Sequence, residues 1–111
     1  MVFLPTNGNW NVAANWSSGE VPTPAQSPII LNGSVAVLDD NAGTCANLYV
    51  GQGAGPVFKG TLLVRKGASL SVAAMLLGRD FSNFGQVDQM GGTLVVNGYL
   101  SIGDAAGGGS G

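Results

Sequence analysis

Three aspartates are the residues of this chain that could take part in hydrolytic chemistry. Asp80, Asp88 and Asp104 lie just after or between short apolar segments, which places them in loops at the corners of the expected fold. A glycosidase needs two carboxyl groups that face each other across a sugar, about 5 to 9.5 Å apart. Aspartate at such positions more commonly caps a turn through its own backbone. Polysaccharide cleavage is therefore one hypothesis, and turn capping is its structural alternative.

The composition limits other catalytic and metal-binding chemistry. The chain has no histidine, which excludes a Ser-His-Asp or Cys-His relay and a zinc site of the usual Cys/His kind. Asp39, Asp40 and Asn41 supply hard oxygen atoms of the type that calcium prefers, but two adjacent carboxylates do not by themselves make a site. Cys45 is the only cysteine, and we expect it to be a small buried apolar residue. We predict no catalytic residue, no metal site, no cofactor and no enzymatic activity.

Aromatic side chains offer a flat apolar face with a polar group, which suits stacking on sugar rings. The candidates are Trp10, Trp16, Tyr49 and Tyr99. For the two tryptophans we expect burial in the core, because tryptophan is highly buried on average. For the two tyrosines, glycan contact and a protein interface remain open alternatives.

The elements that would position these residues repeat along the chain. Gly-Thr-Leu-Leu-Val at 60–64 returns as Gly-Thr-Leu-Val-Val at 92–96, and an apolar-x-apolar-Gly phrase ends at Gly51, Gly78 and Gly103. Short strands that are each closed by a turn glycine at a regular interval are typical of coils that stack on their neighbours. No ten-residue stretch keeps a 3.6-residue apolar period, so we predict essentially no helix. The predicted fold is an all-β solenoid.

The chain is expected to form one domain in two parts. Residues 1–27 hold both tryptophans and three of the five prolines, which predicts an irregular N-terminal cap whose indoles close one end of the core. Residues 28–111 would form the coils, and Asn32-Gly33 is a strong turn signal. Strands are expected at 28–31, 34–38, 46–51, 61–65, 69–72, 75–77, 93–96 and 99–102, with loops at 52–59 and 79–90.

Alternation of side chains along each strand sorts the two faces. Leu62 and Val64 are expected to stack inside on Leu94 and Val96, which would give Leu63 and Val95 the same outward position. A column of outward apolar residues indicates a contact surface. The predicted oligomer interface consists of Tyr49, Leu63, Leu76, Val95 and Tyr99.

The small number of charged residues limits the classes of partner that we expect. Charged residues make up 9% of the chain and the net charge is −2, which gives no electrostatic reason to expect nucleic acid or an anionic membrane. The longest apolar run, 72–77, is far too short to span a bilayer, so we predict no membrane insertion. Pro5 interrupts the apolar start, and no signal peptide is recognisable. We expect either a protein made without export, as a virion protein would be, or a mature fragment with an added methionine.

Several motifs resemble those of bacterial and bacteriophage β-solenoid proteins. The pattern Asn-Trp at 9–10, Asn-Trp-Ser-Ser-Gly at 15–19 and Pro22 resembles the first coil of such proteins, and 47–51, 60–64 and 91–98 look like autotransporter-type and pectin-lyase-like repeats. The resemblance implies a right-handed parallel β-helix of the kind used in surface adhesins, virion spikes and fibres, and it carries over no catalytic residue. Such proteins are usually several times longer. The glycine-rich end at 107–111 predicts either the start of a longer protein or a last coil that another subunit closes.

These observations predict a non-enzymatic structural protein that self-associates in a virion, as a decoration, spike or fibre, or in an extracellular filament. The expected partners are further copies of the chain as a homo-oligomer or polymer, other virion or surface proteins, and glycans. The alternative is a fragment of a secreted bacterial adhesin, or of a carbohydrate-binding or polysaccharide-cleaving β-helix protein. Either function places the chain in a virion, outside the cell or at the cell surface.

Overall fold

The computed structural model describes residues 1–39, 42–51, 59–78 and 84–102 of the 111-residue chain. Nearly all of its regular structure is β-strand, and one short 3₁₀ turn, η1 (Ala13–Asn15), lies near the N-terminus. The strands are β1 (Asn7–Asn9), β2 (Ile29–Ile30), β3 (Ser34–Leu38), β4 (Ala42–Val50), β5 (Lys59–Arg65), β6 (Ser69–Leu77), β7 (Phe84–Met90), β8 (Thr93–Val96) and β9 (Leu100–Ile102).

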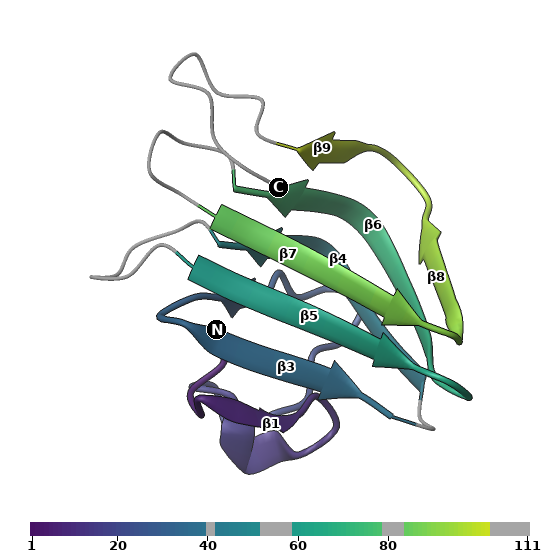
Figure 1. Cartoon of the computed structure of the whole chain (residues 1–111). Helices are drawn as coiled ribbons and strands as arrows, with labels where there is room; N and C mark the ends of the chain where they lie inside the picture. The colour runs from purple at the N-terminus through teal and green to yellow at the C-terminus, as the bar shows by residue number, and fades with distance from the viewer. Residues whose placement is uncertain (40–41, 52–58, 79–83, 103–111) are drawn as a thin grey trace.

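Successive strands alternate between two parallel sheets. One sheet has the order β1-β3-β5-β7 and the other β2-β4-β6-β8, and β9 pairs with β6 beyond the stretch that β8 occupies. Figure 1 shows β3, β5 and β7 as straight strands on one side, and we call the sheet β1-β3-β5-β7 the straight sheet. The longer, curved β4 and β6 lie on the other side, and we call their sheet, which also holds β2, β8 and β9, the curved sheet. The chain therefore forms a parallel β-solenoid of about three turns, which confirms the predicted fold.

The register of the curved sheet confirms one of the two sequence repeats at Gly51 and Gly78, and the third glycine of that repeat, Gly103, lies outside the described residues. Val50 pairs with Leu77, and Leu77 pairs with Ile102. Gly51 and Gly78 follow two of these residues with φ angles of 73° and 51°, a left-handed conformation that glycine adopts without steric cost. The Gly78 amide donates to the Val50 carbonyl oxygen at 3.0 Å. These two glycines are thus equivalent turn positions in consecutive coils.

The prediction that residues 60–64 stack on residues 92–96 is wrong. Leu62 pairs with Ala36 and Val87 in one sheet, whereas Leu94 pairs with Leu70 in the other sheet. Residues 60–64 and 92–96 are therefore not equivalent, and Leu63 and Val95 do not share an outward position. A leading glycine and alternating aliphatic residues are local features that strands of both sheets share.

Several strand boundaries also differ from those expected. The predicted loop at 79–90 contains β7, the predicted strands at 69–72 and 75–77 are one continuous strand β6, and β4 begins at Ala42 rather than at 46. The N-terminal segment 1–27 contributes β1, which pairs in parallel with β3. β7 carries Gln86, Asp88 and Gln89, and so it lacks the apolar alternation by which strands are recognised.

The core consists of side chains that stack in register between coils. Leu62 lies beside Ala36, Leu48 beside Met75 and Val50 beside Leu77, and all six are buried. At one end Phe3, Trp10 and Trp16 join the same cluster. Their rings meet edge to face, with centroids 4.9 Å apart for Phe3 and Trp16 and 5.1 Å apart for the two indoles. Such pairs add about 0.5–1.5 kcal/mol beyond the area that they bury.

Two glycines allow the sheets to approach closely at one corner. Gly60 pairs with Ser34 on one side and Gly85 on the other, so the two glycines occupy the same position in successive coils. A Cβ atom on Gly60 would overlap the carbonyl oxygen of Ile30, and one on Gly85 would overlap that of Val50. The close approach of two backbones therefore requires glycine at this corner.

Candidate functional site

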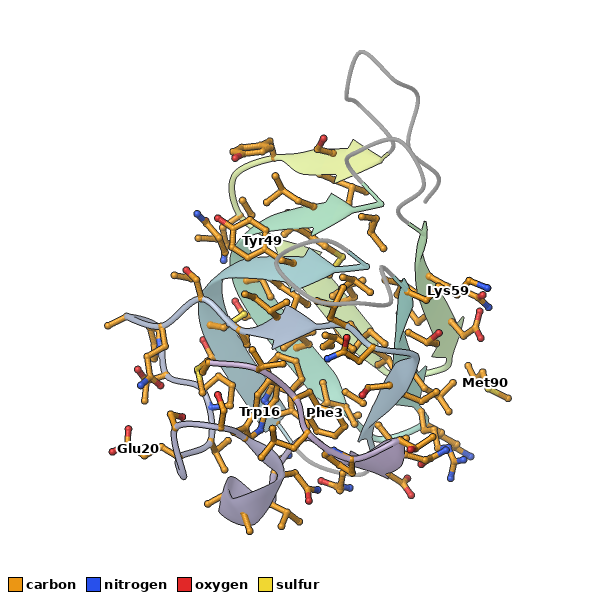
Figure 2. The ribbon with its side chains drawn as sticks, turned by 90° about the vertical axis from the view of Figure 1, so that its left-hand side faces the viewer. Phe3, Trp16, Glu20, Tyr49, Lys59 and Met90 are labelled. Carbon is orange, nitrogen blue, oxygen red and sulfur yellow. The ribbon has the colours of Figure 1, made fainter. Side chains whose placement is uncertain are left out.

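At the N-terminal end of the stack the chain itself covers the outer edge of β2, whereas β1 is the outermost strand of the other sheet. Val2 pairs with Ile29 at the outer edge of β2, and Phe3 forms an antiparallel bridge with Trp16. The Ser17 amide donates to the Val2 carbonyl oxygen at 2.9 Å, and the Asn15 side-chain amide donates to the Asn9 carbonyl oxygen of β1 at 3.0 Å. Residues 1–17 thus use backbone groups that another strand would otherwise need. Figure 2 shows Phe3 and Trp16 at this end of the stack.

The opposite end is different. We call it the open end and define it as the outer edges of β7, β8 and β9 with the core-facing side chains Val87, Leu94, Val96 and Leu100. Within the described residues no strand pairs with these edges. Figure 1 shows β8 and β9 lying beyond β6 at the far end of the stack from β1.

Register shows what a further coil would cover at the open end. Leu100 pairs with Met75, yet Leu100 is 53% exposed and Met75 is 1% exposed. Leu94 and Val96 pair with Leu70 and Val72, and they are half-buried where those partners are fully buried. A side chain at the same inward position is therefore buried in the middle of the stack and accessible to solvent at its end.

Exposed apolar side chains gather near the open end. Six large apolar side chains are exposed in the described part of the chain, and four of them fall between residues 90 and 100. These four are Met90, Val95, Tyr99 and Leu100, while the other two, Leu4 and Val12, belong to the N-terminal segment. Sequence reasoning placed Leu100 correctly on the inward face but missed its exposure, because burial there requires a coil that the described residues do not provide.

The open end also has few of the features that keep natural strand edges apart. Edge strands are commonly protected by charged residues, especially lysine, and by proline. Residues 84–102 contain one charged residue, Asp88, and no proline. The Asp88 carboxylate accepts hydrogen bonds of 2.9 and 3.0 Å from the Gln86 side-chain amide, and it lies in register with the outward Leu63.

The five predicted interface residues do not form one surface. Leu63 belongs to the straight sheet, whereas Tyr49, Leu76 and Val95 belong to the curved sheet. Tyr49 pairs with Leu76, but Leu76 is only 4% exposed and offers little accessible area. Tyr49 and Leu63 are half-buried, and Figure 2 shows Tyr49 at the outer face. Of the five, Val95 and Tyr99 have the most exposed side chains, and both lie in the last coil.

The acidic candidates are only partly within the described residues. Asp80 and Asp104, like Asp40 and Asn41 of the calcium hypothesis, lie outside them. Asp39 forms an exposed ion pair with Arg65 at 3.7 Å, an arrangement that contributes little to stability. No group of three or more Asp, Glu, Cys or His able to hold a metal occurs in the described ranges, and no pocket opens among their residues.

Cys45 is buried within the curved sheet, where it pairs with Val72. Burial without a charged partner raises the pKa of its thiol from 9.0 to about 12. The thiol is therefore protonated at neutral pH and serves as an apolar core group, as expected.

Comparison with known proteins provides no relative. No family model matches the chain, and neither a curated protein nor a solved structure does. Within the described residues no helix has the length and apolar character needed to cross a membrane. Of the predicted resemblance to bacterial and bacteriophage solenoids, the structure shows the parallel β-solenoid fold alone.

Proposed function

We propose that this chain is a non-enzymatic structural module that self-associates, as part of a virion or of an extracellular filament. The observation that carries the proposal is the accessible apolar core at the open end, where Leu100 occupies the inward position that Met75 fills one coil earlier. Apolar surface concentrated in one area of a sparsely charged protein is characteristic of an interaction site. The resemblance to phage and bacterial surface solenoids supports a virion or cell-surface setting.

The test is the mass of the protein in solution over a wide concentration range. Sedimentation velocity of the full chain should show reversible formation of a heavier species as concentration rises. A protein that sediments as a monomer up to millimolar concentration would contradict the proposal. A membrane or nucleic-acid partner is not part of it.

A second candidate is glycan binding by an adhesin-like surface, and it depends on the two tyrosines. Tyr49 lies on the outer face of the curved sheet, and Tyr99, just before β9 in the same sheet, is exposed. β4 and β9 flank β6 in one sheet, so about 10 Å separates their backbones. Glycan-array binding that is lost on Tyr49→Ala or Tyr99→Ala would favour this function, and absence of binding to any glycan would remove it.

A further inference from the structure

We propose that the outer face of the curved sheet binds an uncharged polysaccharide. The inference rests on the second candidate function, to which it adds the ligand class and the binding surface, and it does not depend on self-association. We call this surface the neutral face and define it as the outward side chains of β4, β6, β8 and β9 together with Asn97 and Tyr99. Its supports are the absence of charge, a pair of tyrosines, a row of hydroxyl and amide groups, and the composition of the surface.

The neutral face carries no charged side chain. None of the described strands of the curved sheet contains Asp, Glu, Lys or Arg. The charged residues of the described ranges lie in the straight sheet, just after β3 and β5, and in the N-terminal segment, and they are Glu20, Asp39, Lys59, Arg65, Lys66 and Asp88. An ionic group that leaves water needs a charged or hydrogen-bonding partner to offset its lost hydration. The face therefore favours a neutral glycan over an acidic one.

Two tyrosines flank the central strand of the neutral face. Tyr49 of β4 pairs with Leu76 of β6, and the register of β9 places Tyr99 beside Ala74 on the other side of β6. The Tyr99 carbonyl oxygen accepts a hydrogen bond of 3.0 Å from the Met75 amide, which holds this residue against β6. Ala74 and Leu76 are buried, yet neither belongs to the core cluster, so they form a floor between the two tyrosines. The two rings can thus offer apolar faces to different sugar units of one chain.

A row of hydroxyl and amide groups lies next to the tyrosines. Thr44 pairs with Ser71, and the Asn97 side-chain amide donates to the Ser71 hydroxyl oxygen at 3.1 Å and to the Val72 carbonyl oxygen at 3.3 Å. These bonds use the amide nitrogen of Asn97, so its Oδ1 atom can accept a further bond, and the Ser71 hydroxyl can donate its own proton. A sugar hydroxyl both donates and accepts, and it therefore matches the Ser71 and Asn97 pair.

The composition of the neutral face is unlike that of a protein contact. Serine and alanine are depleted at protein interfaces, where aromatic residues, methionine and arginine are enriched. Small side chains on the outward side of β4, β6 and β8 include Ala42, Thr44, Ser69, Ser71, Ala73 and Thr93. No pocket opens among the described residues, so this surface does not enclose a single sugar. A polymer that contacts several points of the face fits it better.

The test is an array of neutral and acidic glycans of different lengths, probed with the full chain at about 0.05 M and about 0.5 M sodium chloride. Wild type should bind neutral chains of several sugar units, and the affinity should be the same at both salt concentrations because no charge pair forms. This selectivity is measured on unaltered protein, so it does not depend on whether a variant folds.

Variants then locate the surface. Tyr49→Ala and Tyr99→Ala should each weaken binding at least about fivefold, and Tyr99→Phe, which keeps the ring, should weaken it clearly less. Ser71→Ala should also weaken binding, because it removes a hydroxyl from the face. Met90→Ala is the control, since Met90 is 66% exposed but belongs to the straight sheet, and it should bind as wild type does.

The outcomes that contradict the inference are distinguishable. A preference for acidic glycans, or binding that weakens as salt rises, would show that the ligand class is wrong while glycan binding stands. Equal losses in Met90→Ala and Tyr99→Ala would show that the surface is wrong. Absence of binding to any glycan would remove both the inference and the second candidate function. Self-association lost in Tyr99→Ala, without glycan binding by wild type, would make the neutral face a contact between copies of the chain.

Discussion

At the scale of single residues, the two buried indoles differ in their hydrogen bonding. The Trp16 Nε1–H donates to the Trp10 carbonyl oxygen at 2.8 Å, whereas the Trp10 Nε1–H is buried with no acceptor in the described part of the chain. Trp16→Phe leaves a buried carbonyl without its donor, while Trp10→Phe removes a donor that is already unpaired. We expect Trp16→Phe to lower the free energy of unfolding by about 1 kcal/mol more than Trp10→Phe in urea titrations.

The two variants control for each other, because both delete the same atoms from fully buried positions in contact with one another. Any loss in the free energy of unfolding that comes from the cavity alone is therefore common to both variants. An equal loss in both, or a larger loss for Trp10→Phe, would show that the Trp16 hydrogen bond does not stabilise this end of the core.

The Cys45 thiol gives a prediction about pH. Its pKa is about 12 when folded, against 9.0 for an ordinary thiol, so from pH 9 to 12 the unfolded chain releases a proton that the folded chain keeps. The free energy of unfolding should therefore fall with rising pH over this interval. In Cys45→Ala that contribution should be missing, which parallel urea titrations at pH 8 and 10.5 would measure.

Thiol reactivity provides a second measurement of the same burial. At pH 8 a disulfide reagent such as DTNB should not modify the native protein within minutes, and it should react fully after unfolding in urea. Rapid modification of the native protein would mean that the curved sheet opens around β4 far more readily than its packing indicates.

At the scale of elements, the corner glycines carry the third prediction. Gly60→Ala and Gly85→Ala each place a Cβ against a carbonyl oxygen of the neighbouring strand end, which the backbone cannot move away without separating the sheets. Gly8→Ala is the control, because its Cβ would meet the ends of the Asn15 and Pro5 side chains. We expect the corner variants to lose about 2 kcal/mol or more in urea titrations and Gly8→Ala clearly less.

If Gly60→Ala and Gly85→Ala are no less stable than Gly8→Ala, the two sheets do not meet as closely as the structure has them. The paired design also separates backbone overlap from helix or strand propensity, since all three glycines lie in strands.

Strand identity could be predicted from the sequence better than strand pairing. The bounds of β3 and β8 match the expected 34–38 and 93–96, and Gly51 and Gly78 are the turn residues that the repeat indicated. Pairing could not be predicted from 60–64 and 92–96, since alternation says which face is buried and not which sheet a strand joins. β7 was missed because only Val87 among its described inward side chains is apolar.

The candidate surface was predictable only in part for a related reason. Val95 and Tyr99 were expected to be exposed and are exposed, but Leu76 is covered and Leu100 is not. Leu76 lies between Tyr49 and Ser101 of the neighbouring strands, whereas the exposure of Leu100 depends on how many coils lie above it. A sequence pattern describes one coil at a time, so it carries no information about which coil is the last.

At the scale of the whole molecule, stability should vary along the stack. In a solenoid each coil contacts only its neighbours, so a coil at an end has one stabilising interface and a central coil has two. β4 and β6 are paired over almost their full length, with β6 also bound by β8 and β9. The N-terminal segment adds the aromatic cluster to its end, and the open end has no such addition in the described residues.

Hydrogen exchange should therefore follow position in the stack. At low protein concentration we expect the slowest amide exchange in β4 and β6 and faster exchange in β8 and β9, measured by mass spectrometry of peptides that cover 42–50, 69–77 and 93–102. Raising the concentration through the range where the heavier species forms should slow exchange in β8 and β9 and leave β4 and β6 unchanged, because pairing at the open end protects only the last coil. Uniform protection at every concentration would mean that the stack unfolds as one unit and that its end gains nothing from a partner.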